Sequence, residues 1–196
     1  KYKAMVMVDD AHATGVLGRT GSGTPEHFNL TQNDVDIMMG TLSKALAGAG
    51  GYVAGKRDLI RFLRVTSRPY IFSTAMPAHI SAGLIAAIKL VQEHPELREK
   101  LWKNASQLRE GFKQCGFNTL NSQSPIIPVL IGDEKKAIEA ARMLFEKGFF
   151  APCVRWPAVP KRQARIRFTV MASHTEKQID SLLQEFQKIG KELTIV

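Results

Sequence analysis

Cysteine is scarce in this 196-residue sequence, and long hydrophobic runs are absent from it. Two cysteines, Cys115 and Cys153, are too few for a disulfide framework, so we expect a reducing, cytoplasmic compartment. The longest apolar runs, such as residues 82–88, are far too short to span a bilayer, and no signal-peptide pattern is visible, so no membrane partner is expected. An initiator methionine is also lacking, since the chain opens at Lys1, and we expect it to be a piece of a larger protein.

Acidic residues are outnumbered, with 18 Asp and Glu against 27 Lys and Arg, which gives a net charge of +9. Such an excess is compatible with nucleic-acid binding, and the one dense basic patch, residues 155–167, contains no acid. No recognisable nucleic-acid module with interleaved aromatics accompanies it, so a solvated face with a small anion site is favoured and no nucleic-acid partner is expected. A hydrophobic content of 44% supports a packed core and excludes disorder as the main state.

Strand-like and helix-like segments alternate along the chain, which is typical of an α/β fold. Short apolar runs predict strands over 4–8, 35–40, 51–54, 126–131, 149–154 and 165–170. Apolar residues at helical spacing predict helices over 56–65, 77–91, 95–115 and 134–147, and Thr175 with Gln178 forms the capping box of a last helix. We expect the helix at Pro95 to divide the chain into the end of a layered α/β domain, 1–95, and a smaller α+β domain, 96–196.

Asp9 and His12 follow the first predicted strand and precede the glycine-rich residues 15–23. Ligands of α/β sheets collect at the carboxyl ends of strands, and a carboxylate there beside an imidazole suits a cofactor whose ring nitrogen stays protonated. Alternatively, this pair caps a helix or binds a metal. Lys44 follows the second predicted strand, where a partly deprotonated amine can form a Schiff base; alternatively, it is a surface lysine in a flexible loop.

Small hydroxyl residues are candidate phosphate ligands. Thr41 and Ser43 lie just after the second predicted strand, and the glycine-rich residues 48–51 allow a ligand to approach the backbone closely. Ser73 and Thr74 precede a predicted helix start, where two hydroxyls either cap the helix or hold a phosphate.

Arg165 and Arg167 alternate along a predicted strand, so both point to the same face. A planar guanidinium aimed inward would hold a substrate carboxylate through two hydrogen bonds, whereas exposed strand arginines would be solvated. The histidines and cysteines show no metal-ligand spacing, so we assign no metal site.

In chain order, four stretches form a specific series: VDDAHATGVLGRTGSG (8–23), DIMMGTLSKALAGAGGYVAG (36–55), SRPYIFSTAMP (67–77) and VPKRQARIRFTVMASHT (159–175). The series resembles the α-oxoamine synthase family of pyridoxal-phosphate enzymes, which have the aspartate-aminotransferase-like fold (fold type I). Because members of that family are much longer, the resemblance implies that this chain is the C-terminal half. It would comprise the end of the large cofactor-binding domain and the whole small α+β domain.

The resemblance implies a cofactor role for four of the candidate residues. Asp9 matches the carboxylate that pairs with the pyridine nitrogen of pyridoxal 5'-phosphate, and His12 matches the imidazole near its phenolic oxygen. Lys44 matches the lysine that binds the cofactor covalently and later moves the Cα proton of the substrate. Thr41 matches a ligand of the cofactor phosphate.

Three further residues would complete the site. Ser73 and Thr74 match residues that reach the cofactor phosphate of the neighbouring subunit, which implies a homodimer with a shared active site. Arg165 matches the arginine that binds the substrate carboxylate, and Arg167 is its neighbour on the same strand.

The activity that the resemblance implies is the condensation of an amino acid with an acyl-CoA, which releases CoA and CO2 and gives an α-amino ketone. An aminotransferase of the same fold is the nearest enzymatic alternative. The alternative that is not an enzyme is an inactive fragment or a binding-only partner subunit, although Lys44 argues against a degenerate subunit. We expect these 196 residues not to turn over substrate by themselves.

Overall fold

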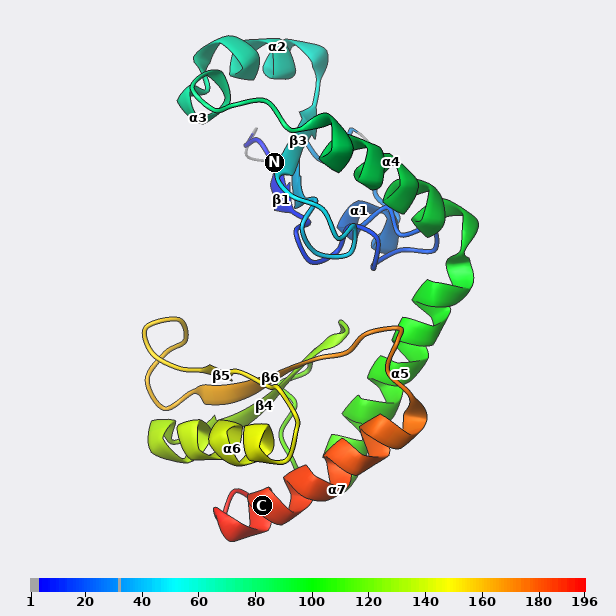
Figure 1. The fold of residues 1–196 in the computed structure, drawn as a ribbon. Coiled ribbons are helices and arrows are strands. Elements are labelled where there is room, and N and C mark those ends of the chain that lie inside the picture. The colour runs from blue at the N-terminus through cyan, green and yellow to red at the C-terminus, as the bar shows by residue number, and fades with distance from the viewer. Residues whose placement is uncertain (1–3, 32) are drawn as a thin grey trace. The chain divides into compact units, whose positions relative to one another are not determined.

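The computed structural model describes residues 4–31 and 33–196, and the chain divides between Arg98 and Glu99 into two compact units (Figure 1). We call the residues before this division unit 1 and those after it unit 2. The division falls in the first turn of helix α5 (Pro95–Gln114), which begins at the residue where the sequence predicts a helix start. Across the described ranges, no helix combines the length and apolar character needed to cross a bilayer.

Unit 1 is built on a three-stranded sheet of order β1-β2-β3. Its strands are β1 (Met7–Asp9), β2 (Ile37–Thr41) and β3 (Gly51–Gly55), and its helices are α1 (Thr24–His27), α2 (Arg57–Thr66), α3 (Arg68–Ile71) and α4 (Ala78–Glu93). β1 and β2 are parallel, whereas β3 runs antiparallel to β2. The carboxyl ends of β1 and β2 therefore meet at the edge of the sheet where β3 begins.

The apolar residues of unit 1 are only partly covered by its own chain. Among its described residues, four buried hydrophobic side chains contribute to its interior: Ala13, Val35, Leu46 and Leu84. No residue of α2 is buried, and Phe62 on that helix is 61% exposed. The strongly apolar helix α4 buries only Leu84.

Unit 2 is a three-stranded antiparallel sheet covered by helices. Its strands are β4 (Ile126–Gly132), β5 (Cys153–Val154) and β6 (Ala164–Thr169) in the order β4-β6-β5, and its helices are the remainder of α5, α6 (Glu134–Glu146) and α7 (Glu176–Glu192). Figure 1 shows α6 lying across the three strands. Because the strand order is β4-β6-β5, β6 is the central strand, and its side chains contribute to both faces of the sheet.

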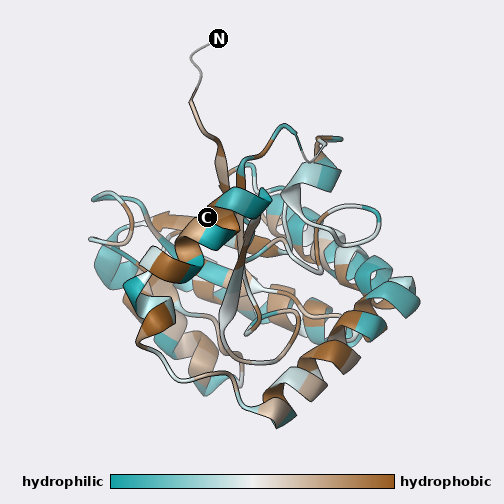
Figure 2. Ribbon diagram, turned by 90° about the horizontal axis from the view of Figure 1, so that it is seen from above, coloured by the Kyte–Doolittle hydropathy of each residue, from teal (hydrophilic) through white to brown (hydrophobic). Residues whose placement is uncertain are grey.

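Four phenylalanines form the centre of the unit 2 core. Phe112 of α5 lies 4.7 Å from Phe168 of β6, 5.5 Å from Phe186 of α7 and 5.9 Å from Phe117, measured between ring centroids. The helices bury only their apolar stripes, and Figure 2 shows hydrophobic and hydrophilic residues alternating along the helix that ends at the C-terminus. Burial of these aromatic rings, together with the aliphatic side chains of the same cluster, contributes hydrophobic stabilisation to unit 2.

The structure corrects the predicted elements at three points. The strand predicted over 149–154 is paired only at Cys153–Val154, because Pro152 has no N–H to give to a strand ladder. The strand predicted over 4–8 pairs only from Met7 to Asp9, since β2 does not begin before Ile37. The short helices α1 and α3 were not predicted, because four residues are too few to show a helical period.

Candidate functional site

Asp9 is the last residue of β1 and His12 lies in the turn that follows it. Both side chains are exposed, and Asp9 pairs in register with Met39 of the parallel strand β2. The Oδ1 atom of Asp9 accepts a hydrogen bond of 2.9 Å from the backbone N–H of Ala11, which is the geometry of an Asx turn. This bond takes only one of the carboxylate oxygens, so Asp9 keeps acceptor capacity toward solvent or a ligand.

Lys44 lies in the loop of residues 42–50 that joins β2 to β3, and its side chain is exposed. The base of the loop is closed by hydrogen bonds from Leu42 N–H to the Gly50 carbonyl at 3.0 Å and from Gly48 N–H to the Leu42 carbonyl at 2.8 Å. A further bond of 3.0 Å runs from Ala47 N–H to the Lys44 carbonyl. The loop thus has defined backbone hydrogen bonds, and Lys44 is exposed on it, as the alternative interpretation of a surface lysine also expects.

Thr41 ends β2 immediately before this loop. Its Oγ1 lies 2.8 Å from the hydroxyl of Ser43 and donates to the Gly50 carbonyl at 3.2 Å. The parallel pairing of β1 with β2 brings Asp9, His12, Thr41 and Lys44 to one edge of the sheet, where the two strands end. A carboxylate, an imidazole, hydroxyls and an ammonium group are thus presented together by unit 1.

The structure bears on two alternative interpretations of these residues. Within residues 4–31 and 33–196, no group of three or more His, Cys, Asp or Glu side chains could hold a metal ion. Asp9 is also not a helix cap, since its carboxylate closes a turn, and the nearest helix, α1, has Gly23 as its N-cap.

Ser73 and Thr74 are exposed and lie in the segment between α3 and α4. Helix α4 begins at Ala78 with Pro77 at its N-cap and no capping bond from a side chain. The interpretation of the two hydroxyls as helix caps is therefore wrong, and both remain available to other partners.

Arg165 and Arg167 lie in unit 2, on the same face of β6, while Ala164, Ile166 and Phe168 fill the opposite, buried face. The Nε of Arg165 donates to the Gln163 carbonyl at 3.0 Å, and its Nη2 lies 3.1 Å from Oε1 of the same residue. These bonds fix the direction of the guanidinium and use only part of its donor set.

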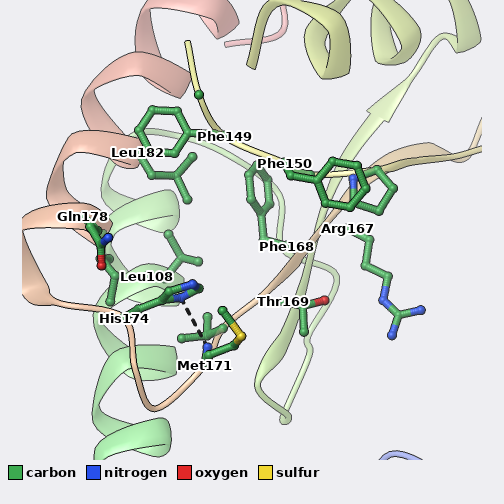
Figure 3. Close-up of a pocket in the computed structure, with 15 residues that line it drawn as sticks. Leu108, Phe149, Phe150, Arg167, Phe168, Thr169, Met171, His174, Gln178 and Leu182 are labelled. Carbon is green, nitrogen blue, oxygen red and sulfur yellow. Dashed lines mark hydrogen bonds between the residues drawn. The ribbon is translucent and has the colours of Figure 1, made fainter. Parts of the chain in front are cut away.

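A cavity of about 560 Å³ in unit 2 is lined mostly by apolar side chains, with Arg167 and His174 among the polar ones (Figure 3). The Nδ1 of His174 accepts from the Met171 N–H at 3.3 Å, and buried Asn104 donates to the carbonyls of Met171 and His174. The sequence assigned no role to His174 because it lies in no metal spacing. The Ser-His-Thr helix start was the only signal at this position.

A second cavity, of about 900 Å³, lies within unit 1 beside the Lys44 loop. Its lining includes Leu42 and Leu46, which lie on either side of Lys44 in the sequence, and Arg98. It also includes Thr14 and Tyr52, whose hydroxyl oxygens lie 2.8 Å apart. Tyr52 and Thr14 were missed by sequence reasoning, because the hydrogen bond joins residues that lie on different elements. The glycine spacing of residues 15–23 was the available signal for this part of the site.

Glu26 of α1 holds the glycine-rich segment in place. Its carboxylate accepts hydrogen bonds of 3.0 to 3.1 Å from Thr20 and Ser22, and a Cβ on Gly18 would overlap it. Burial opposes ionisation of Glu26, but the backbone N–H groups of Ser22 and Thr20, the Thr20 hydroxyl and the charge of Arg19 outweigh it, and the pKa of Glu26 falls below its usual value. The segment after His12 is thus fixed by an ionised carboxylate at neutral pH.

Comparison with known proteins supplies a family and several relatives. The model of the family described as aminotransferase class I and II matches residues 1–186. The chain is 50% identical, over its whole length and 49% of the relative, to 8-amino-7-oxononanoate synthase of Thermoanaerobacter pseudethanolicus. It is 45% identical, over its whole length and 50% of the relative, to a Thermus thermophilus protein named 8-amino-7-oxononanoate synthase/2-amino-3-ketobutyrate coenzyme A ligase.

A solved structure shows the same likeness. A serine palmitoyltransferase variant from S. paucimobilis with a bound PLP–myriocin aldimine superposes with a TM-score of 0.93 at 32% identity, covering 99% of this chain and 49% of that one. The fold is thus aspartate-aminotransferase-like, as predicted. The chain spans about half the length of the curated relatives that it matches.

Proposed function

Because the chain belongs to the aminotransferase class I and II family, we propose that it carries the lysine-bearing part of the active site of an α-oxoamine synthase. Such an enzyme condenses an amino acid with an acyl-CoA and releases CoA and CO2. The observation that carries the proposal is the edge of the unit 1 sheet, where Asp9, His12, Thr41 and Lys44 come together after two parallel strands.

The groups at this edge fit pyridoxal 5'-phosphate. Thr41 and Ser43 offer hydroxyls for its phosphate, and the exposed carboxylate of Asp9 suits a protonated ring nitrogen. Lys44 would hold the cofactor through Nζ, and His12 would lie toward its phenolic oxygen. When bound, the cofactor supplies an electron sink for the electron pair left on Cα of the amino acid.

The chain's own residues then act as ligands and as a base. Lys44 Nζ takes the Cα proton of the amino acid, a role that suits a lysine on a loop of fixed backbone. Asp9 keeps the ring nitrogen protonated. Arg165 binds the substrate carboxylate, and Ser73 and Thr74, which are exposed, bind the cofactor phosphate of the partner subunit in a homodimer.

Two substrate pairs follow from the names of the relatives. The segments 9–18 and 40–45 favour the 8-amino-7-oxononanoate synthases of biotin synthesis, which implies alanine and pimeloyl-CoA. The segments 67–73 and 160–167 favour the 2-amino-3-ketobutyrate ligases, which implies glycine and acetyl-CoA, and the Thermus thermophilus relative bears both names. We favour the first pair, and an activity like that of serine palmitoyltransferase is the third candidate. The reaction would take place in the cytoplasm.

Borohydride reduction of the whole protein that contains this chain tests the proposal. After loading with pyridoxal phosphate, peptide mass spectrometry should find the reduced cofactor on Lys44. Lys44→Ala should abolish the adduct, whereas Lys56→Ala, at an exposed lysine of unit 1, should leave it unchanged. Absence of the adduct on Lys44 in the unaltered protein would overturn the proposal.

A substrate screen separates the synthase from an aminotransferase. Release of CoA should require both the amino acid and the acyl-CoA, and the comparison of alanine with pimeloyl-CoA against glycine with acetyl-CoA identifies the pair. We expect no turnover from the 196 residues alone, because Ser73 and Thr74 are assigned to a partner's cofactor and the chain spans about half of its relatives. Turnover by these residues alone would contradict this expectation.

A further inference from the structure

Asp10, the neighbour of Asp9 in the sequence, differs from Asp9 in its exposure to solvent. Its side chain is 0% exposed, whereas Asp9 is exposed. Its Oδ2 accepts a hydrogen bond of 2.9 Å from the backbone N–H of Thr24, across the glycine-rich segment. Gly23 has a φ of +99° and passes so close that a Cβ there would overlap Oδ2. A buried carboxylate that approaches the backbone this closely joins two parts of the chain that are 14 residues apart.

The backbone of Asp10 is fixed as tightly as its side chain. Its N–H donates to the Met39 carbonyl of β2 at 2.7 Å. Its carbonyl accepts from the N–H groups of Ala13 at 2.9 Å and Thr14 at 3.0 Å, and from the Thr14 hydroxyl at 3.0 Å. Asp9 precedes this fixed residue directly and His12 lies inside the turn that its carbonyl closes.

The same network reaches the third strand. The Thr14 hydroxyl lies 2.8 Å from the hydroxyl of Tyr52 on β3, and Tyr52 pairs in register with Gly40 of β2. Asp10 is thus connected to β2 through its N–H, to β3 through Thr14, and to the start of α1 through its carboxylate.

We infer that Asp10 is a positioning residue for Asp9 and His12: it fixes the turn that aims their side chains at the cofactor, and it does not itself touch the cofactor. The inference rests on the proposed function for the identity of the cofactor, while the network that carries it lies in the chain itself. A small displacement of a reacting group lowers the reaction rate strongly. The hydrogen bond between the Asp10 carboxylate and the Thr24 N–H should therefore influence the reaction, although Asp10 does not contact the cofactor.

The test compares Asp10→Ala and Asp10→Asn with Asp36→Ala in the whole protein. Asp36 is a matched control, because its Oδ2 also accepts a backbone N–H bond of 2.9 Å, from Val6, at the opposite end of β1. Asparagine keeps an acceptor for Thr24 but places an amide at Oδ1, which has no hydrogen-bond partner in the part of the chain that the structure describes. It should therefore rescue the alanine variant in part.

Two readouts are needed, one of them without cofactor. In the unloaded protein, amide hydrogen exchange at Thr24, Ala13 and Thr14 should accelerate about tenfold or more in Asp10→Ala and not in Asp36→Ala. In the loaded protein, the pH titration of the cofactor absorbance should shift in Asp10→Ala alone, and kcat/KM should fall about 10- to 100-fold.

The outcomes separate this inference from the proposed function. An Asp10→Ala protein that loads cofactor on Lys44 with an unchanged absorbance titration would overturn the inference, whatever its melting temperature. Equal effects of Asp36→Ala and Asp10→Ala on the titration would also overturn it, since they would indicate a general loss of stability. Failure of the unaltered protein to load cofactor, with the exchange pattern as expected, would instead contradict the proposed function.

Discussion

Gly40 on β2 lies directly under the ring of Tyr52 on β3, so that a Cβ added to Gly40 would be 2.5 Å from both Cζ and the hydroxyl oxygen of Tyr52. The close approach places the Tyr52 hydroxyl at Thr14, on the turn that carries His12. A glycine in the interior of a strand often marks such an approach of a side chain or a ligand.

We expect Gly40→Ala to displace the ring of Tyr52 and break its hydrogen bond to Thr14. Overpacking of this kind lowers the free energy of unfolding by roughly 1–3 kcal/mol. The measurement is denaturant unfolding of the whole protein, together with the chemical shift of the Tyr52 ring. Gly83→Ala on α4 is the control, because a Cβ there meets nothing within 4 Å, and alanine at a helix interior should be stabilising by up to about 1 kcal/mol. Equal unfolding midpoints for the two variants would contradict the packing argument.

Phe112→Ala should be among the most destabilising changes in unit 2. Phe112 is 0% exposed and contacts three other phenylalanine rings, so its truncation leaves a cavity at the centre of the core. The expected loss is about 3–5 kcal/mol of unfolding free energy, measured by chemical denaturation. Phe150→Ala removes a ring that is 85% exposed, and it should change the unfolding free energy by less than about 0.5 kcal/mol. A small loss at Phe112 would show that the core refills around the truncated side chain.

The glycine-rich segment should loosen in acid because of Glu26. The folded pKa of Glu26 lies below its ordinary value of 4.5, so its contribution is complete above that pH and is lost as the pH falls through the folded pKa. Amide chemical shifts of Thr20 and Ser22 should follow this titration. Glu26→Gln should remove the titration, whereas Asp34→Asn, which changes a carboxylate that accepts hydrogen bonds from Thr31, should leave it intact. A pH-independent shift at Ser22 in the unaltered protein would contradict the assignment.

The elements with a clear period were predicted well. The capping box of Thr175 and Gln178 is present at the start of α7, and Gly148 has the positive φ expected after α6. β4 and β6 begin within a residue of the predicted positions, because alternating or continuous apolar residues specify them directly. Assignments of this kind need only local information.

The parts that depend on distant contacts were not predicted. The apolar run that begins at Phe149 does not show by itself where its pairing with β6 starts, and nothing near Tyr52 indicates its partner Thr14. The order of the site residues was accessible through the motif series, whereas Asp10 was not singled out. The importance of Asp10 comes from the burial of its side chain and from its hydrogen bond with the Thr24 N–H. Both depend on the fold and cannot be read from the motif.

The closed base of the Lys44 loop restrains the backbone but leaves the Lys44 side chain free to rotate. The bonds that join Leu42 to Gly50 and Gly48 hold the backbone at the base of the loop, whereas rotation of the flexible carbon stem of Lys44 breaks none of them. A single amine on such a loop can occupy two positions in turn, one as the attachment point and one as the base, while its Cα stays in place. The length of the lysine side chain would then set the distance over which Nζ of Lys44 can move between these two positions.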